Sequence, residues 1–111
     1  MPLKGRKLET VGVCLPSLEH CRPSQYGGLR EAFNWLSLAE IPYRIVPEGL
    51  LTTDWDGLDD LIVVPNGVSL QGKRKLQGFC AAGGTIVSLG HEMGLAQEMQ
   101  FDDWKKSRNK V

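Results

Sequence analysis

The sequence lacks a net charge and a long apolar run, and each absence narrows the class of protein. Its 13 lysine and arginine residues balance 13 aspartate and glutamate residues, so no overall field attracts nucleic acid or an anionic membrane. No apolar run approaches the roughly 20 residues of a membrane-spanning helix, and residues 1–7 lead into no signal-type segment. We therefore expect a cytoplasmic protein that binds neither nucleic acid nor a membrane.

Cysteine is scarce, and its spacing excludes two further classes. Cys14, Cys21 and Cys80 are an odd number, without the short paired spacings of a zinc site or a disulfide framework. We expect reduced thiols, no metal and no other cofactor. Low-complexity stretches and internal repeats are also absent from the 111 residues. The predicted organisation is a single domain over residues 1–104, followed by a flexible basic tail over residues 105–111.

Short apolar runs that alternate with helical patterns predict an α/β fold with a parallel sheet. The predicted strands cover residues 10–15, 43–46, 61–64 and 85–89. Helices are predicted from the Ser24 cap to Pro42, from the Ser69 cap to Gly83, and over residues 91–99. Right-handed crossovers give the strand order 2-1-3-4. Strands that are apolar on both faces require helices on both sides, so we predict a flavodoxin-like, three-layer αβα domain.

The outer edge of the fourth predicted strand needs protection. Residues 85–89 are apolar on both faces, and no later segment has the pattern of a fifth strand. The third helix can fold over this edge, two copies of the chain can pair there, or the chain is half of a longer protein. We predict a homo-oligomer, specifically a homodimer, that forms through the edge of the fourth strand.

Residues 58–90 carry a resemblance to a known family. An acidic approach leads into a strand that ends in Val64-Pro65-Asn66-Gly67, and a helix then leads to Ala-Ala-Gly-Gly-Thr-Ile-Val-Ser at residues 81–88. This arrangement resembles the class I glutamine amidotransferase-like superfamily. It is most similar to the non-catalytic branch in trimerisation domains of β-galactosidases and in accessory domains of other glycoside hydrolases. The resemblance implies a flavodoxin-like module that binds or assembles without catalysis.

The next segment, Ser88-Leu89-Gly90-His91-Glu92, is similar to the nucleophile elbow of the catalytic amidotransferases. In that elbow a cysteine precedes Leu-Gly-His-Gln, whereas here Ser88 takes the cysteine position and Glu92 the glutamine position. A serine needs a base to remove its proton. The family's histidine and glutamate would lie beyond Val111, so the resemblance implies that amidotransferase activity is absent.

A ligand site is predicted at the carboxyl ends of the strands, where open α/β sheets bind their ligands. Free amides at the start of the first helix can hold a carboxylate or a phosphate there. We predict that a small anionic ligand is bound by His20, Cys21, Arg22, Ser24, Gln25, Tyr26, Asn66, His91 and Glu92.

An enzymatic alternative uses the same end of the sheet. A small hydrolase or thiol-dependent enzyme would have Cys14 or Ser88 as nucleophile, activated by His20 or His91. Each residue also has a structural interpretation, because a cysteine at a strand end is often part of the core. Trp35, Trp55 and Trp104 are expected to pack in the interior or at an interface rather than to stack on a sugar.

Overall fold

The protein folds into one five-stranded parallel sheet with helices on both faces. The computed structural model describes residues 10–15, 27–47, 49, 57–64, 70–90 and 92–108, and structural statements here refer to these residues. The elements in chain order are β1 (Val11–Leu15), α1 (Gly27–Leu38), β2 (Tyr43–Pro47), β3 (Asp60–Val63), α3 (Leu70–Ala81), β4 (Thr85–Ser88), β5 (Glu98–Gln100) and α4 (Phe101–Arg108). The strand order is β2-β1-β3-β4-β5, and every neighbouring pair is parallel.

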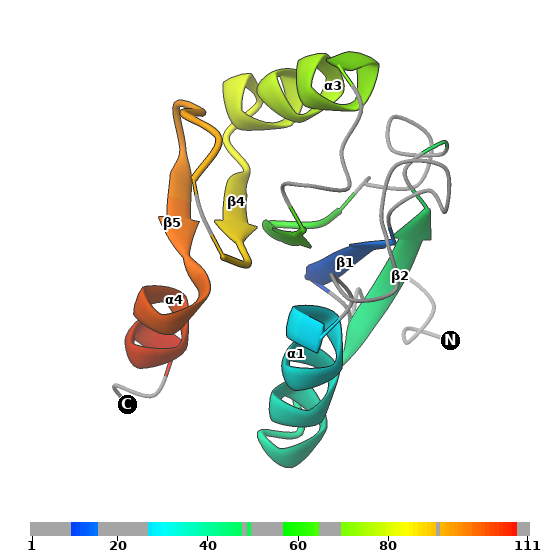
Figure 1. The fold of residues 1–111 in the computed structure, drawn as a ribbon, viewed down its shortest axis with the longest axis vertical. Helices are drawn as coiled ribbons and strands as arrows, with labels where there is room; N and C mark the ends of the chain where they lie inside the picture. Colours follow the sequence, from blue (N-terminus) through cyan, green and yellow to red (C-terminus); the bar gives the residue numbers. More distant parts are fainter. Residues whose placement is uncertain are drawn as a thin grey trace, which may run out of the picture.

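Helix α3 covers one face of the sheet, and α1 and α4 cover the other (Figure 1). Successive side chains of a strand point to opposite faces, so each central strand contributes to both cores. Ile62 and Val87 are buried on the α1 and α4 side, whereas Leu61 and Ile86 are buried on the α3 side. The domain therefore has three layers and two apolar cores.

The helices form where the apolar residues recur at helical spacing. In α1, Leu29, Ala32 and Leu36 lie on one buried stripe, and Glu40, with φ of 58°, adopts a left-handed conformation just after the helix ends. In α3, the buried residues are Gly72, Leu76, Phe79 and Cys80. None of the described helices is long and apolar enough to cross a membrane.

The predicted α/β class and the order of the first four strands are confirmed. The prediction of a helix over residues 91–99 is wrong, since residues 92–95 are irregular, 96–97 form a turn and 98–100 form β5. Gly94, with φ of 81°, adopts a left-handed conformation that an α-helix cannot contain. Gly94 lies in the middle of residues 91–99, so the weak apolar spacing of that segment does not produce a helix.

Strand β5 covers the edge of β4 that the sequence analysis left open. Its register places Glu98 beside Ile86, Met99 beside Val87 and Gln100 beside Ser88. The edge through which a homodimer was expected is thus occupied by the chain's own fifth strand. A second copy cannot pair with β4 there without displacing β5.

Residues 105–108, predicted as the start of a flexible tail, instead form the end of α4. Arg108 Nη1 lies 3.4 Å from Asp60 Oδ2, which fixes this end of the helix to the start of β3. Burial raises the pKa of Asp60, and the charge of Arg108 and a hydrogen bond from Trp104 only partly oppose that rise. The rest of the predicted tail, residues 109–111, lies outside the described residues.

Two glycines near the end of α3 should respond oppositely to replacement by alanine. A Cβ at Gly84 would overlap the buried ring of Phe79, whereas nothing lies within 4 Å of a Cβ at Gly78 inside the helix. We expect Gly84→Ala to lower the free energy of unfolding by about 1–3 kcal/mol. We expect Gly78→Ala to raise it by about 0.5–1 kcal/mol, because alanine favours helix. Urea denaturation measures both values, and equal effects would contradict this packing.

Candidate functional site

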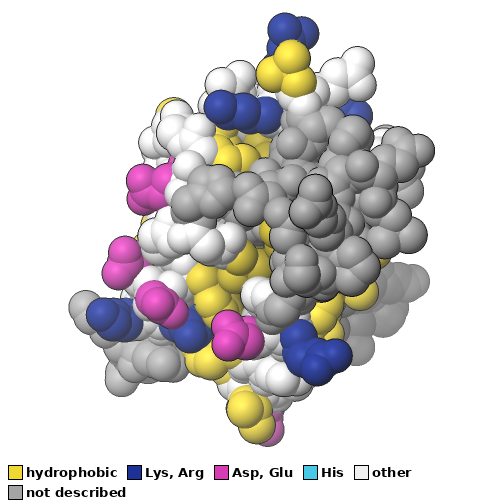
Figure 2. Space-filling view, viewed as in Figure 1, with side chains coloured by type: hydrophobic (Ala, Val, Ile, Leu, Met, Phe, Trp, Pro, Cys, Tyr) yellow, Lys and Arg dark blue, Asp and Glu magenta, His cyan; other side chains and the backbone are white. Residues whose placement is uncertain are grey.

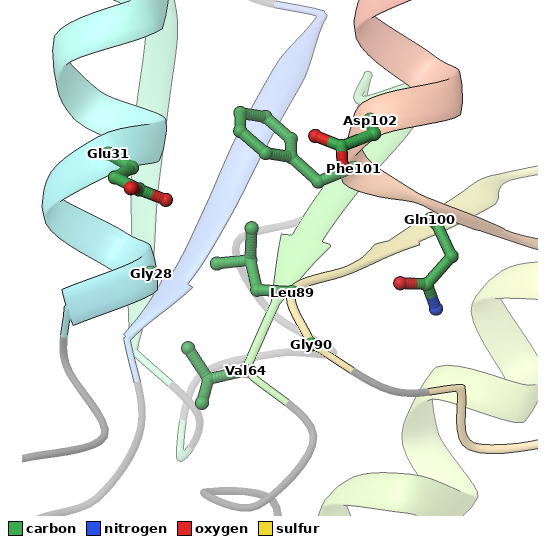
Figure 3. Close-up of a pocket in the computed structure, with 8 residues that line it drawn as sticks. All are labelled: Gly28, Glu31, Val64, Leu89, Gly90, Gln100, Phe101 and Asp102. Carbon is green, nitrogen blue, oxygen red and sulfur yellow. The ribbon is translucent and has the colours of Figure 1, made fainter.

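A cavity of about 400 Å³ opens at the carboxyl ends of the strands, on the side of the sheet that α1 and α4 cover. Its position is the one at which open α/β sheets bind ligands. The residues that line it come from the starts of α1 and α4 and from the ends of β3, β4 and β5 (Figure 3); they are Gly28, Glu31, Val64, Leu89, Gly90, Gln100, Phe101 and Asp102.

The cavity combines an apolar wall with polar groups around it. Val64, Leu89 and Phe101 form the apolar part, and all three pack in or against the core between the sheet and helices α1 and α4. Glu31 on α1 and Asp102 on α4 lie on opposite sides of it (Figure 3). Gln100, at the end of β5, adds a carboxamide that can donate and accept. The arrangement suits a ligand that has one apolar surface and several hydroxyl groups.

The backbone leaves room in this cavity at two glycines. A Cβ on Gly28 would lie 3.5 Å from the Cβ of Leu89, so a larger side chain would extend toward the cavity wall. Gly90 has φ of 108°, a conformation that residues with a Cβ rarely adopt. The chain can therefore turn out of β4 without placing a side chain in the cavity.

The electrostatics of the lining are mildly acidic. The two ionisable residues among those lining the cavity, Glu31 and Asp102, are both carboxylates. Asp102 also forms an exposed ion pair with Lys105, 3.3 Å away, and lies in the first turn of α4, whose helix dipole it offsets. Figure 2 shows acidic side chains along the side of the molecule where β5 and α4 lie, with basic side chains beside them near α4. This lining favours hydrogen-bond donors over the small anion expected from the sequence.

Most residues predicted to bind a ligand lie outside the described part of the chain. These are His20, Cys21, Arg22, Ser24, Gln25, Tyr26, Asn66 and His91. Glu92 is described and exposed, in the connection between β4 and β5, and it is not one of the residues that line the cavity.

Sequence reasoning missed Glu31, Gln100 and Asp102, the polar residues that do line the cavity. Glu31 lies in the second turn of the helix that follows β1, so the predicted topology could have identified it. Gln100 and Asp102 reach the cavity only because β5 joins the sheet and α4 starts directly after it. No apolar pattern in the sequence indicates that short strand.

The two candidate nucleophiles lie away from the cavity. Cys14 is 1% exposed and packs in the core between the sheet and α3. Ser88 is completely buried, and its hydroxyl donates a hydrogen bond to the Glu98 carboxylate. Because Ser88 pairs in register with Val63, which packs on the α3 side, its side chain points to the face opposite the cavity.

Glu98 organises a second polar cluster on the α3 side of the sheet. Besides the Ser88 hydroxyl, its carboxylate accepts hydrogen bonds from the backbone amides of Met93 (2.6 Å), Gly94 (2.8 Å) and Leu95 (2.9 Å). Burial raises the pKa of Glu98, but these hydrogen bonds outweigh burial and hold that pKa below its ordinary value. Glu98 is therefore ionised at neutral pH.

The remaining predicted roles can be placed in part. Among the described residues, no group of three or more His, Cys, Asp and Glu side chains could hold a metal ion. Trp104 is 3% exposed, and its ring centroid lies 5.6 Å from that of Trp35 in an edge-to-face arrangement. The expected packing role of this pair is confirmed. Trp55 lies outside the described residues.

Comparison of the chain with protein-family models, curated proteins and solved structures found no match. The resemblance to the amidotransferase-like superfamily stays a prediction from the sequence. The function must therefore be inferred from the geometry of the cavity and of the Glu98 cluster.

The burial of Cys14 and Cys80 predicts low thiol reactivity in the native state. Both side chains are at most 5% exposed, and only an exposed thiolate reacts rapidly with an alkylating reagent. We expect iodoacetamide to leave both residues unmodified in buffer and to modify both in concentrated urea, as measured by peptide mass spectrometry. Rapid native modification of Cys14 would instead support the thiol-dependent enzyme.

Proposed function

We propose that this protein is a non-catalytic binding module whose cavity takes a small, neutral, polyhydroxylated ligand such as a monosaccharide. The observation that carries the proposal is the lining at the strand ends, where Glu31, Gln100 and Asp102 surround an apolar wall. Carboxylate and carboxamide oxygens accept hydrogen bonds from hydroxyl groups. The apolar wall suits the C–H face of a sugar ring, which water solvates poorly.

Charge and size favour this class of ligand over others. A phosphate or carboxylate ligand would meet two carboxylates, so the lining disfavours it even where the helix amides attract an anion. The cavity, about 400 Å³, is at the small end of the range that ligand pockets occupy, roughly 300–1,000 Å³. Such a volume suits one small molecule rather than a dinucleotide.

The architecture supports the same proposal. The strand order β2-β1-β3-β4-β5, with helices on both faces, is the order of flavodoxin-like folds, which bind ligands at the carboxyl ends of their strands. We propose a flavodoxin-like, amidotransferase-like module on this basis and on the sequence resemblance. The burial of Ser88 and Cys14 favours binding over the enzymatic alternative.

Binding can be tested by saturation-transfer NMR with glucose, galactose and glucuronate, and inorganic phosphate, which has no C–H protons to observe, is tested as a competitor for the bound sugar. The cavity lining predicts that the neutral sugars bind and that glucuronate and phosphate bind more weakly than glucose. Preferential binding of phosphate or glucuronate would overturn the proposed ligand class. If no member of the set bound, the proposed function would fail.

Asp102 and Asp103 provide a matched pair of variants for the site. Both lie in the first turn of α4, but only Asp102 lines the cavity. We expect Asp102→Asn to weaken binding of the preferred sugar about tenfold, the typical effect of losing a hydrogen bond to a charged group. Asp103→Asn removes the same charge from the same helix end and should leave the dissociation constant unchanged. Titration calorimetry measures both, and equal weakening would argue against contact with Asp102.

A further inference from the structure

Several backbone amides of the connection between β4 and β5 converge on a single side chain, that of Glu98. Three consecutive backbone amides, those of Met93, Gly94 and Leu95, donate to the carboxylate of Glu98. The Ser88 hydroxyl donates to the same carboxylate from the end of β4. Consecutive amides that converge in this way form a backbone anion-binding nest, here filled by a carboxylate of the same chain.

This connection has no helix to satisfy its backbone. Parallel strands are usually joined by a crossover of about a dozen residues or more that contains a helix. Here residues 89–97 suffice, and 92–95 belong to no helix or strand. Gly90 and Gly94, with φ of 108° and 81°, make turns that residues with a Cβ rarely adopt. The carboxylate of Glu98 provides the acceptors that a crossover helix would otherwise provide for its own amides.

Only the ionised form of Glu98 matches this set of donors. An ionised carboxylate has about four lone-pair sites, and four donors point at it. A protonated carboxyl group becomes a donor at one oxygen and a weaker acceptor overall, so the Ser88 hydroxyl must turn to accept and the hydrogen bonds from the amides weaken. A weakened or lost hydrogen bond at one of these amides destabilises the loop conformation that depends on it.

The connection also contributes to the proposed ligand site. Leu89 and Gly90, the two residues that follow Ser88, both line the cavity. The amide of Leu89 donates to the carbonyl of Val63 at 2.9 Å, which fixes the start of the connection on the sheet. Beyond that point, the hydrogen bonds to Glu98 hold the loop whose first turn forms one wall of the cavity.

We propose that Glu98 is a pH-sensitive lock, whose ionised carboxylate holds the connection over residues 92–95 and whose protonation releases that connection together with the Gly90 wall of the cavity. The effect on ligand binding rests on the proposed function, whereas the release of the loop does not. Because the pKa of Glu98 is lowered from 4.5, the lock is complete above that pH. It opens as the pH falls through the lower value in the folded protein.

The pKa of Glu98 is shifted by burial and by its four hydrogen bonds, and the other titratable groups on neighbouring elements must be separated from it in the experiment. On the described elements next to Glu98 they are Glu92 in the connection, Lys73, Arg74, Lys75 and Cys80 on α3, and Asp102, Asp103, Lys105, Lys106 and Arg108 on α4. Glu92 is exposed and lies in the same connection, so it is the appropriate control for a carboxylate of this loop that does not hold the amides.

The experiment follows amide hydrogen exchange and amide chemical shifts by NMR between pH 7 and pH 3. In the wild-type chain we expect the protection factors of Met93, Gly94 and Leu95 to fall tenfold or more below the pKa of Glu98, with Gly90 shifting at the same midpoint. Core amides such as Val13 and Ile62 should stay protected. Loss of core protection at the same pH would mean global unfolding and would overturn the proposal.

Two variants complete the test. Glu98→Gln places an NH₂ group among the donors, so its loop amides should already be unprotected at pH 7 and should not respond to pH. Glu92→Gln should behave like the wild-type chain, and loss of the pH response in that variant would overturn the proposal. If Glu98→Gln does not fold, the wild-type titration still decides. Sugar binding measured at pH 7 separates the two proposals, since its absence contradicts the proposed function and leaves the loop result unaffected.

Discussion

The parallel pairing of β5 with β4 is the interaction on which the rest of this end of the molecule depends. Helix α4 begins at Phe101, the residue directly after β5, so the position of β5 sets the position of α4. Gln100, Phe101 and Asp102 reach the cavity for this reason. At its other end α4 is held by the contact of Arg108 with Asp60. The cavity and one of the two cores therefore both require that the chain return to the sheet after β4.

This return is made by a short connection whose amides are satisfied by a side chain. A crossover helix would bury an apolar stripe and pair its amides internally, whereas this connection buries Leu95 and directs three amides to Glu98. A carboxylate in a partly buried position has an unfavourable desolvation energy, which four hydrogen bonds offset. Loss of the negative charge on Glu98 would therefore affect the whole connection between β4 and β5. The same physical feature gives the loop its order and its expected sensitivity to acid.

The sequence predicts those strands and helices whose apolar residues form continuous runs or recur at helical spacing. The β-branched runs at 61–64 and 85–89 identify β3 and β4, and the spacing of Leu29, Ala32 and Leu36 identifies α1. Strand β5 could not be predicted, because its residues Glu98, Met99 and Gln100 have little apolar character. It is held by pairing with β4 and by the hydrogen bonds of Glu98, and neither of these interactions depends on the apolar spacing from which strands are predicted. Without β5, the edge of β4 was expected to pair with a second copy, and the cavity residues on β5 and α4 were not identified.

The titration of the Glu98 side-chain carboxyl carbon, followed by ¹³C NMR, tests most directly whether this carboxylate holds the β4–β5 connection. Four hydrogen bonds to the ionised form predict a midpoint clearly below 4.5, with the amide shifts of Met93, Gly94 and Leu95 following the same curve. A midpoint at or above 4.5, with those amide shifts unchanged, would show that the carboxylate is solvated. It would then follow that the connection is held by other contacts.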